Sequence, residues 1–364
     1  MRTLLLTFVV LCPAIAQAAI DCPLRDQPYS IDSPLIDVLL KPEAKAIVVK
    51  QMPDIEHLPS QMFGTTAPSF AAIMSLRTMA AWGHTPDSTL QSLDASLQTL
   101  PVSSADRNAR CARYDVDRPD LKIPPGKPRL LLFNKINGFR DGPSVDAANR
   151  ALREMARQNG WALVETDKGG AITPALLKHF DAVIWNNISG DVLTIKERSA
   201  LRSYIEKGGG FVGFHGSGGD PVYFWDWYVD TLIGARFKNH PMNPQFQEAR
   251  IQVEDDSPLS RGLAPGWSMT DEWYSFKNNP REGGAHVIAT LDESSYSPKG
   301  MGDQDLRMGD HPIAWNRCVG AGRSFYSAIG HRPETYVDPH YVQLLQHAIE
   351  WAAQGGAPVC PARP

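Results

Sequence analysis

Lys207-Gly-Gly-Gly-Phe-Val-Gly-Phe-His-Gly-Ser-Gly-Gly-Asp220 carries more structural information than any other segment of this chain. Its first glycines end a helix, and the apolar run 211–214 predicts a short buried strand. The glycines that follow let the backbone approach a ligand closely, and they place His215 directly after the strand. Asp220 and Pro221 are typical of a helix start. A strand, a bare loop and a helix N-terminus together build polar sites at the carboxyl ends of strands in open α/β sheets.

The sequence around this segment alternates between strand and helix patterns. Thr194 and Glu197 form a capping box for the helix that precedes the glycines. We expect strands at 129–133, 161–165, 181–185 and 211–214, separated by helices at 144–159, 174–179 and 194–207. This order predicts a doubly wound α/β domain, with a mostly parallel sheet and helices on both faces. Shorter strands are expected at 249–253, 286–290, 312–315 and 324–329, and a last helix at 341–353.

The region before the α/β pattern has a different character. Helical spacing is visible only at 70–82 and 88–99, and four prolines between 119 and 128 indicate a linker. His57 and His84 lie in this region, where we expect them to serve packing or to lie at the surface. We therefore divide the chain into a signal peptide at 1–18, an N-terminal helical extension at 19–125, an α/β domain at 126–355 and a C-terminal tail at 356–364.

The first residues are typical of a signal peptide. Arg2 supplies a positive charge, 4–11 are mostly apolar, and Ala16-Gln17-Ala18 is a small-x-small cleavage site. We expect cleavage after Ala18 and a secreted or periplasmic protein. No later run is apolar for long enough to span a bilayer, so no membrane contact is expected after cleavage. The formal net charge of −4, without a long basic run, argues against a nucleic-acid partner.

Export would place the cysteines in an oxidising compartment. Removal of Cys12 leaves Cys22, Cys111, Cys318 and Cys360, an even number that permits three pairings. One of them, Cys22–Cys111 with Cys318–Cys360, closes each end of the chain on itself. No two cysteines have the CxxC spacing of a zinc or redox site, so we expect disulfide bonds.

Imidazoles and carboxylates gather where the expected strands end. Rigid sheets present such loop residues as active sites. We predict a site in which His240, Glu272, His311 and His331 converge on His215, whose side chain is expected to lie in a cleft and to bury little apolar area. The predicted catalytic residues are His215, Asp220, Glu272 and His331. The predicted substrate-binding residues are Ser217, His240, Asp271, Asp310, His311 and Asn186.

Three kinds of chemistry fit these residues. His215 can act as a general acid or base with a carboxylate partner such as Glu272. The histidines with Asp220 or Asp271 could instead bind a divalent metal, although no compact spacing such as HExxH requires one. A nucleophilic role is disfavoured, because the turn resembles the G-x-C-x-G turn of class I glutamine amidotransferases with His215 in the place of cysteine. Ser217 lacks the G-x-S-x-G frame. The chain is therefore not expected to be a glutaminase.

Aromatic residues are dense beside these groups, in 223–228 and 267–276. Most of these rings are expected to pack on the sheet. One or two exposed rings beside carboxylates and amides would suit a sugar, whose C–H faces stack on aromatics.

Several motifs, in order, resemble the ThuA-like (trehalose utilisation) family over about residues 129–353. The matching segments are the glycine-rich stretch 208–215, Trp227-Tyr228, 232–237, His240-Pro241, 270–274, 289–293, 308–315, 322–326 and Gly330-His331. The resemblance implies a flavodoxin-like fold of the class I glutamine amidotransferase type and a link to the metabolism of disaccharides or their keto derivatives. The chain departs from the family pattern at Arg140-Asp141, where the family often has Arg-His, and at His215-Gly-Ser, where His-Ala-Ala is usual. The extension has no counterpart in the match.

These observations predict an exported ThuA-like enzyme that acts on a small sugar by acid–base chemistry, as a hydrolase, lyase or isomerase. The expected partner is a small-molecule carbohydrate, and neither a cofactor nor an oligomeric state follows from the sequence. A non-catalytic sugar-binding module and a metal-dependent hydrolase or lyase remain the alternatives.

Overall fold

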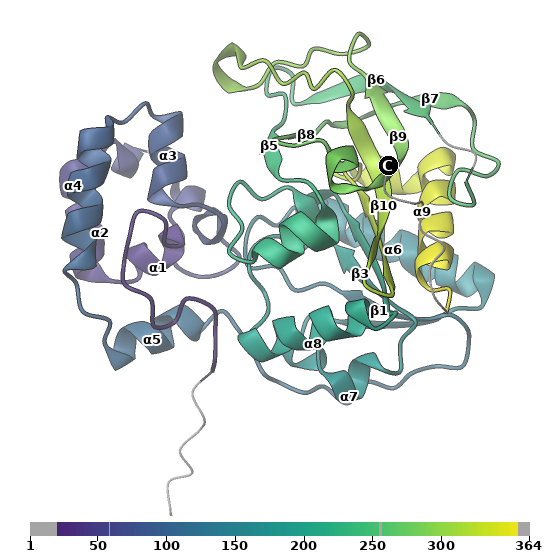
Figure 1. The fold of residues 1–364 in the computed structure, drawn as a ribbon, viewed down its shortest axis with the longest axis horizontal. Coiled ribbons are helices and arrows are strands. Elements are labelled where there is room, and N and C mark those ends of the chain that lie inside the picture. Colours follow the sequence, from purple (N-terminus) through teal and green to yellow (C-terminus); the bar gives the residue numbers. More distant parts are fainter. Residues whose placement is uncertain (1–19, 58, 255–256, 356–364) are drawn as a thin grey trace, which may run out of the picture.

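The computed structural model describes residues 20–57, 59–254 and 257–355, and shows two lobes (Figure 1). One lobe is the N-terminal extension (residues 20–125), which is helical. The other is the α/β domain (residues 129–352), built around one large sheet. Within the described residues no helix is both long and apolar enough to cross a membrane.

Short helices form the N-terminal extension. They are α1 (Leu35–Leu39), α2 (Pro42–Gln51), α3 (Leu76–Trp82), α4 (Asp87–Gln98) and α5 (Ser104–Cys111). The helix expected at 88–99 is confirmed as α4, and its Leu90, Leu93 and Leu97 are buried. The helix expected at 70–82 is instead broken into a 3-10 turn, η3 (Phe70–Ile73), and α3. The break occurs because Ser75 adopts an extended conformation and caps α3 through the Thr78 N–H.

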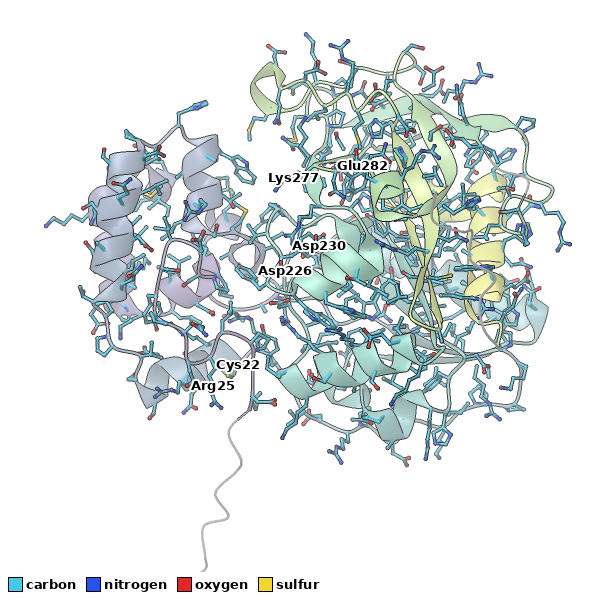
Figure 2. All side chains as sticks on the ribbon, viewed as in Figure 1. Cys22, Arg25, Asp226, Asp230, Lys277 and Glu282 are labelled. Carbon is cyan, nitrogen blue, oxygen red and sulfur yellow. A yellow bond between two sulfur atoms is a disulfide. The ribbon has the colours of Figure 1, made fainter. Side chains whose placement is uncertain are left out.

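A disulfide bond between Cys22 and Cys111 closes the extension. Figure 2 shows Cys22 and Arg25 at the end of the extension that carries α5. Cys318, in the α/β domain, is also disulfide-bonded. Cys360, which the sequence suggested as its partner, lies outside the described residues. The expectation of disulfide bonds is confirmed for the described cysteines.

A nine-stranded sheet organises the α/β domain, in the order β2-β1-β3-β4-β11-β10-β9-β6-β7. The parallel strands are β1 (Arg129–Phe133), β2 (Ala162–Thr166), β3 (Ala182–Asn186), β4 (Gly210–Phe214) and β11 (Gly322–Ser327). The antiparallel strands are β6 (Phe246–Val253), β7 (Gly266–Glu272), β9 (His286–Asp292) and β10 (Pro312–Val319). A separate small pair joins β5 (Phe237–Asn239) to β8 (Ser275–Phe276). The predicted fold class is confirmed.

Helices cover both faces of the parallel strands, as the doubly wound pattern requires (Figure 1). Those of one face, α6 (Gly142–Asn159) and α9 (Pro339–Ala352), both pack on the 3-10 turn η9 (Pro333–Val337). Those of the other, α7 (Pro174–Leu177) and α8 (Ile195–Glu206), pack together. The capping box of Thr194 and Glu197 is confirmed at α8. The apolar faces of these helices and both faces of the central strands form the main core.

Two local expectations differ from the structure. β7 was not predicted as a strand, because its inward-facing side chains include the carboxylate of Asp271 beside Trp267 and Met269. No helix begins at Asp220, and the next helical segment is a π-helix (Trp227–Ile233). Asp220 does not cap a helix, because its carboxylate accepts hydrogen bonds from Ser189 Oγ and Gly190 N, 2.6 and 2.7 Å away.

The extension contacts the α/β domain at the carboxyl ends of β1 and β2. Lys135 Nζ pairs with Asp115 at 2.7 Å, and Asn137 Nδ2 donates to Arg113 O at 3.2 Å. A Cβ atom at Gly138 would come within 2.5 Å of Ile73 Cγ2 in the extension. Glycine at 138 therefore allows the two lobes to pack directly against each other.

Candidate functional site

The turn after β4 presents His215 at the carboxyl edge of the sheet. His215 has a φ of 41°, in the left-handed region that non-glycine residues rarely adopt. A Cβ at Gly219 would lie 2.5 Å from the Tyr274 hydroxyl. The glycines of this turn thus permit the close packing of Tyr274 and Tyr326 around His215, whereas the bare loop was expected to let a ligand approach the backbone.

The hydrogen bonds of His215 fix which nitrogen carries its proton. Nδ1 lies 2.8 Å from the carbonyl oxygen of Ala328, which can only accept, so Nδ1 is protonated in the neutral ring. Nε2 then offers a lone pair. The Tyr274 hydroxyl and His331 Nδ1 each lie 3.0 Å from it. His215 is 4% exposed and stacks on Tyr274, so the expectation that its imidazole buries little area is wrong.

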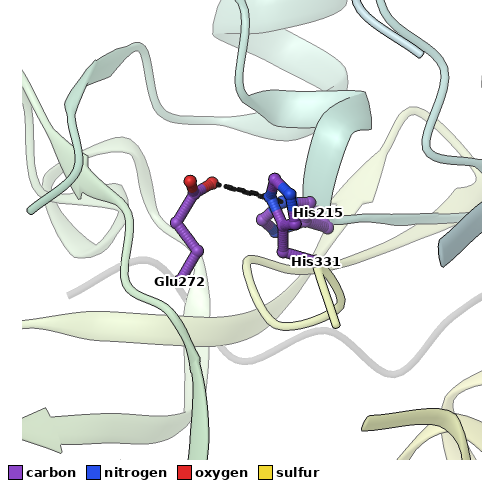
Figure 3. Close-up of side chains that lie close together, drawn as sticks. All are labelled: His215, Glu272 and His331. Atoms are coloured by element: carbon purple, nitrogen blue, oxygen red, sulfur yellow. Dashed lines mark hydrogen bonds and ion pairs between the residues drawn. The ribbon is translucent and has the colours of Figure 1, made fainter. Parts of the chain in front are cut away.

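Glu272, at the end of β7, completes a group that we call the histidine cluster (His215, Glu272 and His331; Figure 3). Its Oε2 lies 3.0 Å from His331 Nδ1 and 3.4 Å from His215 Nε2. Its other oxygen, Oε1, accepts a hydrogen bond from Gln245 and lies 3.4 Å from His240 Nδ1. The three facing atoms of the cluster all lie within 4.8 Å of one another.

The preceding residue, Asp271, anchors the loop that carries His331. Its fully buried carboxylate accepts hydrogen bonds from five donors, at 2.8 to 3.2 Å, which are the N–H groups of Glu272, Gly330, His331 and Arg332 and the hydroxyl of Thr335. The end of β7 is thereby tied to the segment after β11, although the two strands are not neighbours in the sheet. Asp271 thus positions the cluster and does not face it.

Neighbouring charges shift the ionisation of the cluster. Burial raises the pKa of Glu272, but its side-chain contacts with His215 and His331 and the charge of His240 lower it by more, so that it lies well below its usual value. Burial lowers the pKa of His331, but the hydrogen bond and charge of Glu272 raise it by more. Burial, with the charge of Glu272, raises the pKa of Tyr274 well above its usual value. The favoured state is a Glu272 carboxylate beside a His331 imidazolium, with Tyr274 as a hydrogen-bond donor.

The groups around His331 Nε2 are more exposed than those of the cluster on its other side. Its Nε2 lies 3.8 Å from Asp141 Oδ2, in the segment after β1. The rings of Phe139 and Phe246 border its imidazole, with centroids 6.2 and 5.1 Å away. Both phenylalanines are partly exposed, at 44% and 39%. The Nε2 side of His331 is therefore bordered by partly exposed groups.

Three of the other predicted residues, Ser217, Asn186 and Asp220, use their polar atoms for hydrogen bonds within the protein. Ser217 Oγ donates to Trp185 O at 3.0 Å and accepts from Ile188 N. Asn186 is fully buried, and its Nδ2 contacts Asn134, Val145 O and Asn149. Asp220 contacts Ser189 and Gly190, and burial raises its pKa to about 7. These residues lie beneath the edge of the sheet and support its loops.

Asp310 and His311 lie outside the histidine cluster. His311 Nδ1 pairs with Glu293 at 2.8 Å, and its Nε2 donates to Tyr274 O at 2.8 Å. It thus supports the backbone of a residue that contacts His215. Asp310 pairs with Arg281 at 2.7 Å. Of the five residues expected to converge, His215, Glu272 and His331 touch directly and His240 joins through Glu272.

The structure adds five residues that were not predicted for the site, namely Tyr274, Gln245, Asp141, Phe139 and Phe246. A signal existed for Phe246, because strand alternation places it with Glu248, Arg250 and Gln252 on the exposed face of β6. Asp141 was visible as a departure from the family pattern. Gln245 and Phe139 lie in loops, where spacing gives no such signal.

The histidine cluster also has the composition of a metal site. Two imidazole nitrogens and one carboxylate oxygen are a common ligand set for zinc and for non-haem iron. Ligands at about 2.0–2.1 Å from a tetrahedral metal lie roughly 3.3 Å from one another, close to the 3.0, 3.0 and 3.4 Å found here. The Nδ1–H of His215 to Ala328 O and the Gln245 contact to Glu272 would orient two of the ligands. The residues therefore fit a divalent cation.

Comparison with known proteins agrees with this architecture. A family model named ThuA and described as trehalose utilisation matches residues 129–352. A crystal structure of a ThuA-like protein from Bacteroides uniformis is similar, with a TM-score of 0.54 and 24% identity over 64% of this chain and 95% of that one. A ThuA-like protein from Parabacteroides merdae gives a TM-score of 0.46 and 17% identity over 63% of this chain and 91% of that one. No protein with a curated description matches the sequence. The N-terminal extension lies outside the family match.

Proposed function

Because this chain belongs to the ThuA (trehalose utilisation) family, we propose that it is an enzyme of carbohydrate metabolism whose acid–base chemistry is carried by His215, Glu272 and His331. The observation that supports this most is the contact of three ionisable side chains from three separate strand ends. His215 Nε2 and Glu272 Oε2 both lie next to His331 Nδ1, at 3.0 Å each. The substrate class is a small sugar, a disaccharide or its keto derivative.

The arrangement divides the roles of the three residues. Glu272 holds the Nδ1–H of His331, as the carboxylate of a catalytic triad holds its imidazole. This leaves His331 Nε2, on the side of Asp141, as the atom that exchanges a proton with the sugar. Glu272 also stabilises the imidazolium form, in agreement with the raised pKa of His331. His215 Nε2 accepts a hydrogen bond from the Tyr274 hydroxyl. His215 thereby fixes the side of the histidine cluster that is remote from Asp141.

We also propose that the protein is exported and works outside the cytoplasm. The signal-peptide pattern of residues 1–18 supports this, as do the Cys22–Cys111 bond and the disulfide-bonded Cys318. The test is the mass of the N-terminal peptide of protein recovered from the periplasm or medium. A mature N-terminus at Ala19 is expected, and full-length protein confined to the cytoplasm would overturn this proposal.

The acid–base role is tested by turnover of trehalose and of a ring-oxidised disaccharide. Glu272→Gln preserves the shape of the side chain but removes its charge, so kcat should fall by about 10²–10⁴-fold. His331→Asn should lower kcat by a similar factor. His57→Ala, at an exposed histidine of the extension, is the matched control and should behave as wild type. Sugar binding without turnover by the wild type would instead identify a non-catalytic binding module.

A metal-dependent hydrolase or lyase is the second candidate, supported by the 4.8 Å grouping of the same three atoms. A divalent cation held by His215, Glu272 and His331 would supply Lewis-acid chemistry at a sugar oxygen. Chelator treatment followed by metal analysis separates the candidates. Activity that survives chelation supports the metal-free acid–base mechanism. Activity that is lost, and restored by one equivalent of a cation that Glu272→Gln no longer binds, supports the metal.

A further inference from the structure

Two phenylalanine rings beside His331 are far more exposed than the rest of the aromatic core. Phe139 and Phe246 come from the segment after β1 and from the start of β6, yet both border the same imidazole. The neighbouring groups are polar, namely Asp141, His240 and Gln245. Apolar surface next to a few polar groups is typical of a site for a ligand that has both kinds of surface.

Phe246 is held from its other side. The guanidinium of Arg332 lies 5.8 Å from the centre of its ring, and Arg332 is itself paired with Glu334 at 3.2 Å. Cation–π contacts of this kind favour one orientation of an exposed ring. Phe246 belongs to the exposed face of β6, where its ring would otherwise point into solvent. The contact with Arg332 keeps the ring beside the His331 imidazole.

Phe139 is held by both lobes. Its N–H donates to Ser189 Oγ at 2.9 Å, and Ser189 is fixed in turn by Asp220. From the extension, Ser69 N donates to Asn137 O at 3.0 Å, and the ring of Phe70 lies 5.5 Å from that of Phe139. The extension therefore buttresses a ring that contacts His331.

We infer that Phe139 and Phe246 form the two apolar walls of a binding site for one neutral pyranose ring over His331, and that the N-terminal extension sets the position of one wall through Phe70. The inference rests on the proposed function, because it places the reacting sugar against His331 Nε2. The C–H groups of a pyranose carry partial positive charge and match the negative faces of aromatic rings. Its hydroxyls would reach Asp141 and His240, which remain partly exposed.

The experiment measures Kd by calorimetry on the mature full chain, with trehalose, a ring-oxidised disaccharide and the single-ring methyl α-glucopyranoside as probes. Phe246→Leu and Phe139→Leu should each raise Kd by about tenfold or more. Phe246→Tyr should keep the affinity of the wild type because it retains the aromatic face. For turnover, KM should rise while kcat changes by less than about threefold, since the walls do not move protons. The melting temperature should change little because both rings are partly exposed.

The role of the extension has its own control. Phe70→Ala should raise Kd several-fold, whereas Phe63→Ala, at another partly buried aromatic of the extension core, should not. Normal affinity in the two leucine variants would overturn the inference and leave the proposed function intact. An effect of the leucine variants without one of Phe70→Ala would overturn the part assigned to the extension. A wild-type chain that binds none of the three sugars would overturn the proposed function, and the inference with it.

Discussion

The N-terminal extension and the α/β domain meet at the carboxyl edge of the sheet. Within each of these lobes, different contacts stabilise the fold. In the α/β domain, strands far apart in sequence are paired, and the buried carboxylate of Asp271 ties the end of β7 to the loop after β11. In the extension, helices of 5 to 12 residues are closed by one disulfide bond and by ion pairs such as Lys41–Asp106. Side-chain hydrogen bonds, such as those from Arg110 to the carbonyl oxygens of Leu24 and Gln27, take the place of strand pairing in the extension.

The difference shows which conditions should act on which lobe. A sheet with a large common core unfolds cooperatively, whereas short helices depend on their cross-links and caps. Loss of the Cys22–Cys111 bond and a fall in pH should therefore weaken the extension first. Removal of a buried hydrogen-bond acceptor should weaken the α/β domain first. Hydrogen exchange measured separately for peptides of the two lobes can test each case.

The largest effect is expected for removal of the Cys22–Cys111 bond. It joins residues 89 apart in sequence, and closing a loop of that length stabilises by up to about 4.5 kcal/mol through the unfolded state. In the double serine variant, peptides of residues 20–125 should exchange much faster, while those of β3 and β4 keep their protection. Equal loss of protection in both lobes would show that they unfold as one unit.

An intermediate effect is expected for Asp271→Asn. The new amide can accept fewer hydrogen bonds than the carboxylate and turns an N–H₂ group toward backbone donors, at a cost of about 2–4 kcal/mol. Activity should fall with stability, because the loop that carries His331 loses its anchor. Denaturant unfolding should be compared with that of Asp310→Asn, a partly exposed carboxylate paired with Arg281. Similar midpoints for the two variants would contradict the anchoring role of Asp271.

The smallest effect concerns acid. Burial opposes ionisation of Asp106, but hydrogen bonds from Ser103 and the Lys41 ammonium lower its pKa from 3.8 to about 2. A carboxyl whose folded pKa lies below its unfolded value stabilises the fold above pH 4, and that contribution is lost as the pH falls from about 4 to 2. The capping box should contribute about 1 kcal/mol. Urea midpoints at pH 5 and pH 2.5 should differ less in Asp106→Asn than in the wild type. An equal difference in the two proteins would show that ionised Asp106 does not stabilise the fold.

Much of the α/β domain could be predicted because its strands are buried on both faces. Residues such as 130–133 and 211–214 are continuous apolar runs, which a parallel sheet requires. β7 was not predicted as a strand, because Asp271 occupies an inward position where a strand usually has an apolar residue. In the extension, helical spacing continued through Phe70–Trp82, and nothing in that spacing revealed the cap at Ser75.

The histidine cluster was predicted in part, since strand-end position identifies residues that can meet but not those that do. His215, Glu272 and His331 fit that rule and touch. Asp220 fits it equally, yet its partner is Ser189, 31 residues earlier, a pairing that no local pattern contains. Aromatic density pointed to 223–228 and 267–276, whereas the rings beside His331 are the isolated Phe139 and Phe246. Tyr274, from the second of these segments, stacks on His215 instead.

The absent side chain at Gly138 limits how freely the two lobes can be treated as interchangeable modules. Ile73 occupies the space where a Cβ would lie, and Ser189 and Gly190 lie close on the other side. A chain engineered to start at the linker would keep every strand of the sheet but would open a vacancy one residue away from Phe139. Grafting a different N-terminal lobe onto this domain would thus demand a small apolar wedge of the same shape at that point.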